Sequence, residues 1–230
     1  MFVAERSSVG ASTREYATRV PVSPLSRPYA VSKRFLDIAL SLLCLVLALP
    51  VLLLIAVLVR LDSPGPIVFR QRRVGLGGRV FSFYKFRTMQ VNARVRFPEL
   101  YAYRYTRQEF LDMPDKSPGD PRLTRLGRLL RTTSLDELPN LLNVLNGDMS
   151  LVGPRPEIPE MVTYYSEEEL SKFSVRPGVT GLWQVSGRSS LNKGQQLAVD
   201  AEYVKKRSFQ YDLGILAKTA KVVVLRVGAF

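Results

Sequence analysis

The sequence predicts an α+β protein that is mainly helical, contains one short β-hairpin and is anchored to a membrane by a kinked apolar helix. Three observations lead to this fold class. An uncharged run covers Ile38–Val59, two strand-like segments flank the glycines of 75–78, and leucines recur at helical spacing between 120 and 146.

Composition sets the size and excludes several kinds of chemistry. The chain has 230 residues, 46% of them apolar, which suits one medium domain plus a membrane element. It has no histidine, and Cys44 is its one cysteine, so zinc clusters, disulfide frameworks and Ser-His or Cys-His catalysis are excluded. A net charge of +13 favours anionic partners: nucleic acid, acidic lipid or phosphorylated metabolites.

Three regions follow one another along the chain. Residues 1–31 are rich in Ser, Pro and Arg without a sustained apolar period, and we expect a flexible arm. Residues 32–60 contain the apolar run, and residues 61–230 are predicted to form one compact domain because no linker-like segment interrupts them.

The apolar run is long enough to enter a membrane, since 22 helical residues extend about 33 Å. Lys33 and Arg34 precede it and several arginines follow it, so the preference of basic flanks for the cytoplasm applies to both ends. Pro50 lies near the middle and would bend the helix. The residues alone leave a spanning helix and a re-entrant helix equally open.

A β-hairpin is predicted after the membrane run. Pro64-Gly65-Pro66 ends the helix, segments 67–74 and 79–86 have strand character, and the glycines of 75–78 form the turn. A phosphate-binding loop is disfavoured there because no helix opens after the glycines. Residues 90–121 receive no assignment, and Leu213–Val227 is expected to form an amphipathic helix capped by Asp212.

Two helices are predicted within 120–147. The first alternates leucines with Arg122, Arg125, Arg128 and Arg131. The second begins at Ser134, which with Glu137 matches a capping box, and stops at Gly147.

The acidic pair Asp136-Glu137 has two interpretations. Helix entry alone explains two carboxylates in a first turn. They also suit phosphoryl transfer, because an ionised carboxylate is a nucleophile and paired carboxylates are hard ligands for Mg²⁺. Arg131, one turn earlier, and Arg155, between two prolines, would stabilise the transferring phosphate.

Seven blocks in one order make the chain recognisable. They are Lys33-Arg34 with Asp37, LDSPGP at 61–66, FRQRRVG at 69–75, KFRTM at 85–89, DPRLTRLGRLLRTTSLDELP at 120–139, GDMSLVGPRP at 147–156 and RPGVTGLWQVSGRS at 176–189. In these blocks the sequence resembles the bacterial sugar transferase family, the polyprenyl-phosphate hexose-1-phosphate transferases or monotopic phosphoglycosyl transferases.

The resemblance implies a reaction and a location. Members transfer a sugar 1-phosphate from a nucleotide diphosphate sugar, usually a UDP-sugar, to a polyprenyl phosphate such as undecaprenyl phosphate, which releases UMP and begins glycan assembly. The family's Asp forms a covalent phosphosugar intermediate and its Glu helps to hold Mg²⁺, roles that fall on Asp136 and Glu137. A re-entrant helix on the cytoplasmic face of the bacterial inner membrane is implied, with 61–230 as the catalytic domain.

By the same resemblance, Arg131 and Arg155 hold phosphate groups of the donor. Lys85 and Arg87 lie in a matching block and are further phosphate-binding candidates, although a structural ion pair is an equal alternative for them. One departure concerns the kink, because short members place Ser before the proline where this chain has Leu49.

Two other classes of function compete. Interleaved basic and aromatic residues are typical of nucleic-acid binding, but no binding module is recognisable. A non-catalytic scaffold would be expected to lose Asp136 or Glu137, and both are present. The sequence does not identify the sugar, the glycan, the role of Trp183 or the oligomeric state. It is compatible with a homo-oligomer.

Overall fold

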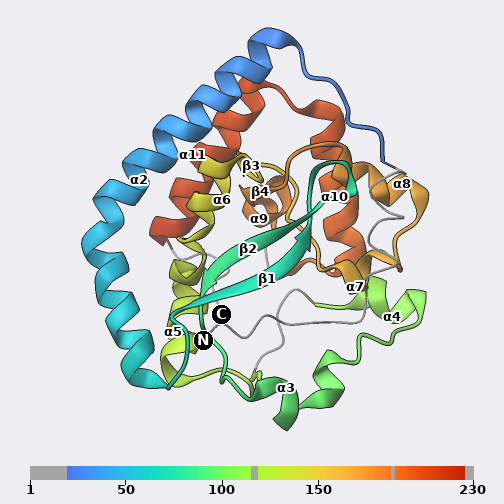
Figure 1. Cartoon of the computed structure of the whole chain (residues 1–230). Coiled ribbons are helices and arrows are strands. Elements are labelled where there is room, and N and C mark those ends of the chain that lie inside the picture. Colours follow the sequence, from blue (N-terminus) through green and yellow to red (C-terminus); the bar gives the residue numbers. More distant parts are fainter. Residues whose placement is uncertain (1–19, 115–118, 188–189, 226–230) are drawn as a thin grey trace.

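The computed structural model describes residues 20–114, 119–187 and 190–225, with the backbone alone for 223–225. Helices dominate the described chain, and the strands form two separate two-stranded sheets (Figure 1). The predicted α+β class is confirmed at this level.

The helices are α2 (Arg27–Asp62), α3 (Ala93–Arg96), α4 (Arg107–Asp112), α5 (Arg125–Thr133), α6 (Asn140–Asn146), α7 (Pro159–Val162), α8 (Glu167–Leu170), α9 (Leu182–Ser186), α10 (Lys193–Lys206) and α11 (Phe209–Leu225). Short 3₁₀ turns are η1 (Leu76–Gly78), η2 (Pro98–Tyr101), η3 (Leu135–Glu137) and η4 (Ser171–Ser174). The strands are β1 (Val68–Val74), β2 (Val80–Phe86), β3 (Ser150–Val152) and β4 (Gly178–Thr180).

The long helix α2 begins earlier than predicted. It starts at Arg27, inside the segment 1–31 expected as a flexible arm, and the Ser23 amide donates to the Ser174 carbonyl at 3.0 Å. Part of the expected arm is therefore held by the domain and part of it is helical. The helix begins early because Pro28 suits a first helical turn and the following residues continue the helix. The rest of the expected arm, 1–19, lies outside the described residues.

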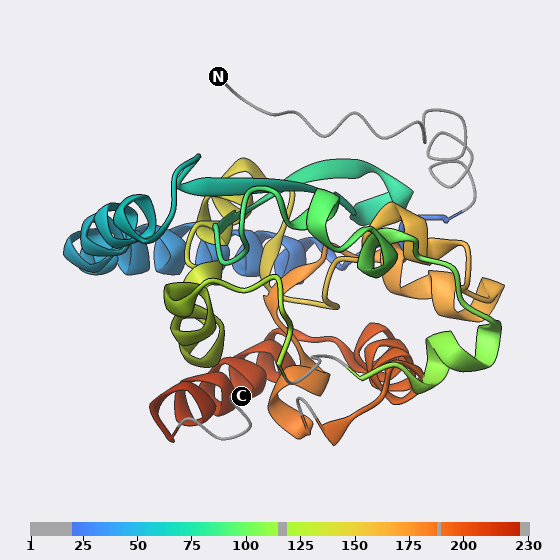
Figure 2. The same ribbon diagram turned by 90° about the horizontal axis from the view of Figure 1, so that it is seen from below.

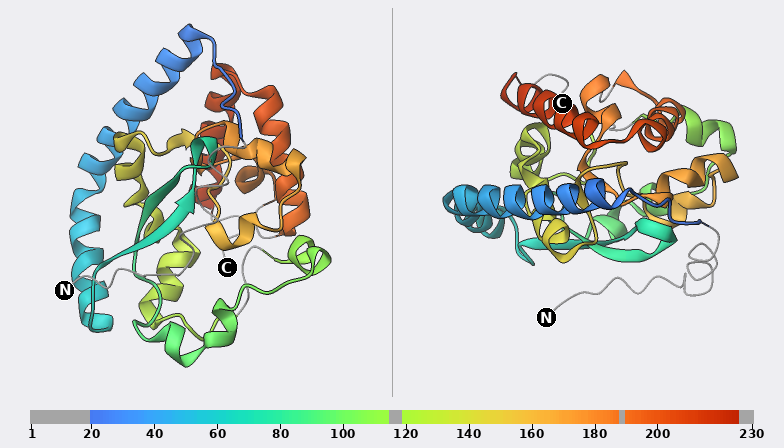
Figure 3. Two further views of the ribbon diagram at one scale, coloured as in Figure 1. Left: turned by 45° about the vertical axis from the view of Figure 1, so that its right-hand side comes forward. Right: turned by 90° about the horizontal axis from the view of Figure 1, so that it is seen from above.

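The helix contains Pro50 and bends in the part that the colour bar places around residue 50 (Figures 1 and 3). Proline removes one backbone donor and clashes with the preceding turn, which accounts for a bend there. Within the described chain, α2 alone is long and apolar enough to cross a membrane. Only 11% of its most apolar 18-residue window is buried, so most of its surface needs another apolar environment.

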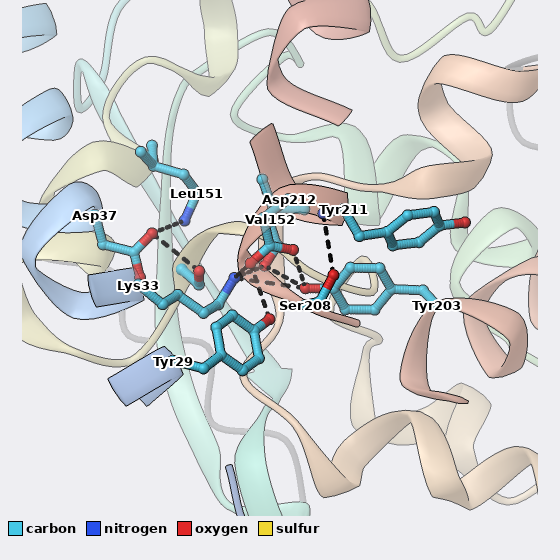
Figure 4. A network of polar contacts seen from close by, with 10 residues as sticks. Tyr29, Lys33, Asp37, Leu151, Val152, Tyr203, Ser208, Tyr211 and Asp212 are labelled. Carbon is cyan, nitrogen blue, oxygen red and sulfur yellow. Dashed lines mark hydrogen bonds and ion pairs between the residues drawn. The ribbon is translucent and has the colours of Figure 1, made fainter. Parts of the chain in front are cut away.

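A polar network fixes the first half of α2 to the domain (Figure 4). The Lys33 ammonium donates to Asp212 Oδ2 at 2.6 Å and to the Val152 carbonyl at 2.9 Å. Tyr29 and Tyr203 each donate a hydroxyl hydrogen to the same carboxylate, at 2.9 and 2.8 Å. Asp212 therefore accepts hydrogen bonds from α2 and α10 and is not the helix cap that was predicted; the Ser208 hydroxyl accepts from the Tyr211 amide instead.

Two further α2 side chains hold the elements that lead to the site. Asp37 accepts hydrogen bonds from Ser150 Oγ at 3.0 Å and the Leu151 amide at 2.9 Å, both on β3. Arg34 donates to the Val144 and Leu145 carbonyls at 2.6 and 2.8 Å. These carbonyls belong to the last turn of α6, so Arg34 satisfies groups that a helix end leaves unpaired.

The second half of α2 packs on the same domain through apolar contacts. Ile55 and Val59 are buried against Phe86 of β2 and Leu130 of α5. Both halves of the bent helix thus contact one folded unit, on either side of its bend.

The predicted hairpin is present. β1 and β2 pair antiparallel from Val68 opposite Phe86 to Val74 opposite Val80. Gly77 and Gly78 have φ of 63° and 77° in the connecting turn, a region that glycine enters without strain. The hairpin and the helices α10 and α11 lie on opposite sides of the molecule (Figures 2 and 3).

The second sheet was not predicted. β3 and β4 are three residues each and pair in parallel, and a Cβ on Gly153 would lie 2.4 Å from the Arg176 carbonyl. Glycine is therefore required where this sheet ends and the loop of Arg155 begins. The residues 90–121, which received no assignment, contain α3, η2 and α4, and 115–118 lie outside the described residues. The expected last helix is α11, and its predicted end, 226–227, also lies outside the described residues.

We predict that Lys33→Met destabilises the protein by about 3 kcal/mol, because the 2% exposed Asp212 carboxylate then loses its counter-ion. Thermal unfolding in detergent measures the effect. Lys206→Met removes the exposed pair with Glu202 and is the matched control, with no measurable change expected. Equal melting temperatures for wild type and Lys33→Met would contradict the importance of this pair.

Candidate active site

The acidic pair lies in a tight turn between two helices. Helix α5 ends at Thr133, and Ser134 adopts a left-handed conformation with φ of 59°. Asp136 and Glu137 form the turn η3, after which α6 begins at Asn140. The predicted capping box is wrong: Ser134 ends the preceding helix, its side chain caps nothing, and Glu137 pairs elsewhere.

Glu137 pairs with Arg155 in a two-pronged contact. Arg155 Nη1 donates to Glu137 Oε2 at 3.1 Å, and Nη2 donates to Oε1. Burial alone would raise the pKa of Glu137, but the charge and hydrogen bonds of Arg155 outweigh it and lower the pKa. This pair joins the acidic turn to the loop after β3.

Asp136 has the opposite character. Its residue is 5% exposed, and burial, together with the neighbouring charge of Glu137, raises its pKa to about 6. The positive charges of Lys85, Arg131 and Arg155 oppose this rise. The two adjacent carboxyl groups are thereby pushed to different pKa values, a pattern typical of sites with divided roles.

Lys85 and Arg131, two of the phosphate-binding candidates, lie near enough to Asp136 for their charges to act on it. Lys85 lies on β2, and burial and the charges of Arg73 and Arg131 lower its pKa to about 8, although Asp136 acts in the other direction. Arg131, on the last turn of α5, has Nη1 3.6 Å from Asp120 Oδ2. Asp120 also pairs with Arg122 at 2.8 Å, so one carboxylate holds both guanidinium groups.

Arg87 does not join this group. Its guanidinium is 5% exposed and donates to the carbonyls of Val59, Ser63 and Pro64 at the end of α2. Arg87 thus satisfies carbonyls at the end of α2, a structural role that differs from the ion pair considered as its alternative. Pro50 lies in the membrane helix, away from the turn, and Trp183 is buried in the protein interior at 3% exposure.

Arg73 was missed by sequence reasoning. Its Nη1 donates to the Pro156 carbonyl at 3.1 Å and lies 3.7 Å from Glu157 Oε1, the two residues that follow Arg155. Alternation along β1 could have found it, because Phe69, Gln71 and Arg73 share the inward face while Arg70 and Arg72 are exposed. The loop of Arg155 is thus held from β1 as well.

Glu157 was also missed, and it connects this loop to the rest of the core. It accepts hydrogen bonds from Lys193 and from the Tyr165 hydroxyl, the latter at 2.8 Å. Lys193, Lys172 and Arg73 hold its pKa well below the usual range despite burial. A fixed anion therefore lies directly behind Arg155.

Comparison with known proteins now identifies the family. Residues 28–226 match the model of the family described as bacterial sugar transferase. Because this match covers most of the chain, the protein belongs to that family.

Three relatives illustrate the range of similarity. The undecaprenyl-phosphate galactose phosphotransferase of Salmonella typhimurium is 42% identical over 86% of this chain and 41% of its own length. The UDP-glucose:undecaprenyl-phosphate glucose-1-phosphate transferase of Caulobacter vibrioides is 39% identical over 96% and 80%. The exopolysaccharide production protein ExoY of Sinorhizobium fredii is 38% identical over 87% and 88%. The chain thus spans about two fifths of the Salmonella relative and most of the other two.

We predict that Lys85→Met raises the pKa of the Asp136 carboxyl above the value near 6, because the variant loses a nearby positive charge. A ¹³C NMR titration of aspartate side-chain carbons measures it, with Asp136→Asn used to assign the signal. Titration of Asp136 near 4 in the wild type, or a lower value in Lys85→Met, would contradict the electrostatics described for this site.

Proposed function

We propose that the protein transfers a sugar 1-phosphate from a UDP-sugar to a polyprenyl phosphate, undecaprenyl phosphate in bacteria, and releases UMP. The names of the Salmonella and Caulobacter relatives support the donor and acceptor classes. The observation that carries the proposal is the buried Asp136 carboxyl, ringed by Lys85, Arg131 and Arg155 beside an already paired Glu137.

The first step is a displacement at phosphorus. An Asp136 oxygen attacks the sugar-bearing phosphorus, a new O–P bond forms, and the bond from this phosphorus to the bridging oxygen breaks. That oxygen leaves with UMP, and Asp136 retains the sugar phosphate as an acyl phosphate. Lys85, Arg131 and Arg155 stabilise the negative charge of the transferring group.

The second step regenerates the carboxylate. An oxygen of the lipid phosphate attacks the same phosphorus, the bond to Asp136 breaks, and the product is a lipid diphosphate sugar. Because UMP leaves before the lipid reacts, the scheme implies ping-pong kinetics. A raised pKa means that Asp136 attacks as the carboxylate above about pH 6.

We propose Mg²⁺ as the cofactor. Among the described residues no group of three or more Asp, Glu, His or Cys side chains is arranged to hold a metal ion, and Arg155 engages both Glu137 oxygens. Two adjacent carboxylates nevertheless fit Mg²⁺, which takes one or two of them together with substrate phosphates and water. When bound there, the ion would neutralise charge on the donor diphosphate, with Asp136 and Glu137 as its protein ligands.

The proposed membrane arrangement is re-entrant. Lys33 and Arg34 bind one half of α2 to the domain, while Ile55 and Val59 pack the other half on it. A helix whose two ends contact one water-exposed domain has both ends on one side of the bilayer. We place this side at the cytoplasmic face of the inner membrane, where the donor nucleotide is found and where basic flanks are retained.

The catalytic proposal predicts that Asp136→Asn releases no UMP from a UDP-sugar in the absence of lipid acceptor, because the amide cannot act as the nucleophile. A panel of UDP-sugars with Mg²⁺ tests this at single turnover. Asp112→Asn, an exposed carboxylate on α4, is the control and should release UMP normally. Undiminished release by Asp136→Asn would sink the mechanism.

The re-entrant arrangement predicts that cysteines at both ends of α2 react from the same side. Ser26→Cys and Asp62→Cys, each introduced into a Cys44→Ala background, are to be labelled with an impermeant maleimide in right-side-out and inside-out vesicles. Both should react only in inside-out vesicles. Labelling of the two positions from opposite sides would show a spanning helix.

A further inference from the structure

One buried polar side chain beside the acidic turn has no partner. Asn140 is 0% exposed, and neither its amide nitrogen nor its amide oxygen forms a hydrogen bond. A buried amide without partners costs roughly 1–3 kcal/mol. Asn140 lies four residues after Asp136 in the sequence.

The backbone places Asn140 on the same side as Asp136. Leu138 and Pro139 have right-handed helical φ and ψ, so a helical path continues from η3 into α6. Bonds of the i→i+3 type tighten this junction, since the Leu141 amide donates to the Leu138 carbonyl at 3.1 Å. Asp136, Asn140 and Asn143 are all buried, and both η3 and α6 pack against β2, so Asp136 and Asn140 lie on the side of this segment that faces the hairpin.

Asn143, one turn further, shows what a structural asparagine does in this stripe. Its Oδ1 accepts from the Tyr84 amide at 3.1 Å, and its Nδ2 donates to the Ser82 carbonyl at 2.6 Å. Asn143 thereby attaches α6 to β2. Asn140 is equally buried and makes neither kind of contact, so attachment to the sheet does not explain it.

We propose that Asn140 is a positioning residue for Asp136, and that its side-chain Nδ2–H donates to the carboxylate when the donor substrate occupies the site. This inference rests on the function proposed above. Hydrogen bonds of catalytic groups are often absent or long without substrate and tighten when it binds. A neutral donor on the inner side of Asp136 would orient the attacking oxygen without adding charge.

The charged groups around Asp136 leave this task to a neutral group. Glu137 on the same turn raises the pKa of Asp136, while Lys85 from β2, Arg131 from α5 and Arg155 from the loop after β3 lower it. These cations are required by the phosphates of the substrate in the mechanism. A hydrogen bond from Asn140 would orient the carboxylate while these cations remain with the substrate.

The test compares Asn140→Leu with Asn143→Leu, since both positions are 0% exposed and one turn apart. Asn140→Leu should melt at or above the wild-type temperature, because it removes unpaired polar atoms. Its rate of UMP release from donor alone should fall about tenfold or more, the loss expected for a hydrogen bond to a charged group. Asn143→Leu should instead lose stability.

The dependence on donor concentration separates positioning from a structural role. In Asn140→Leu the maximal rate of UMP release should fall while the half-saturating UDP-sugar concentration stays near the wild-type value, because Asn140 is proposed to contact the nucleophile and not the donor. Asn140→Gln retains the amide and should restore part of the rate. A wild-type maximal rate in Asn140→Leu would overturn the proposal, as would a loss of stability like that of Asn143→Leu, which would show a structural contact.

Asp136→Asn, measured in parallel, keeps the two proposals distinguishable. If Asp136→Asn releases UMP like the wild type, the proposed function fails. If it is inactive while Asn140→Leu behaves like the wild type, only the role of Asn140 fails.

Discussion

The contact between Glu137 and Arg155 is the interaction on which the candidate site depends. It joins a 3₁₀ turn between α5 and α6 to the loop after β3. Because Arg155 lowers the pKa of Glu137 and keeps it ionised, Asp136 is the carboxyl whose pKa is raised by burial and by the neighbouring charge. Arg73 and Glu157 then fix the loop from behind, so that Arg155 has little freedom to leave.

The same elements are tied to the membrane helix. Asp37 holds β3, which leads into the Arg155 loop, and Arg34 holds the end of α6, which follows the acidic turn. Lys33 and Asp212 bind the last helix to the same half of α2. In the proposed re-entrant arrangement, the depth of α2 in the bilayer therefore sets the height of the site relative to a lipid phosphate, without any separate lipid-binding domain.

Local sequence patterns predicted much of this fold. The glycine turn, the leucine period of α5 and α6 and the stop at Gly147 follow from backbone preferences that act over a few residues. The capping box predicted at Ser134 shows where local patterns fail. Glu137 does not bond back to Ser134, because it forms an ion pair with Arg155, which is distant in the sequence. The role of Arg87 and the pairing of β3 with β4 depend on residues far apart in the chain, which no local period encodes. Arg131 and Arg155 were proposed from their place beside the acidic pair and Lys85 from the resemblance, whereas Asn140 is visible only once burial and hydrogen bonding are known.

The central claim is a covalent bond to Asp136, and trapping tests it most directly. An active preparation would be incubated with UDP-sugar and Mg²⁺ without lipid, quenched, digested and mapped by mass spectrometry. The account predicts a sugar-phosphate adduct on the peptide that contains Asp136, which disappears when polyprenyl phosphate is added. An active preparation that never carries the adduct there, or carries it on another residue, would contradict it.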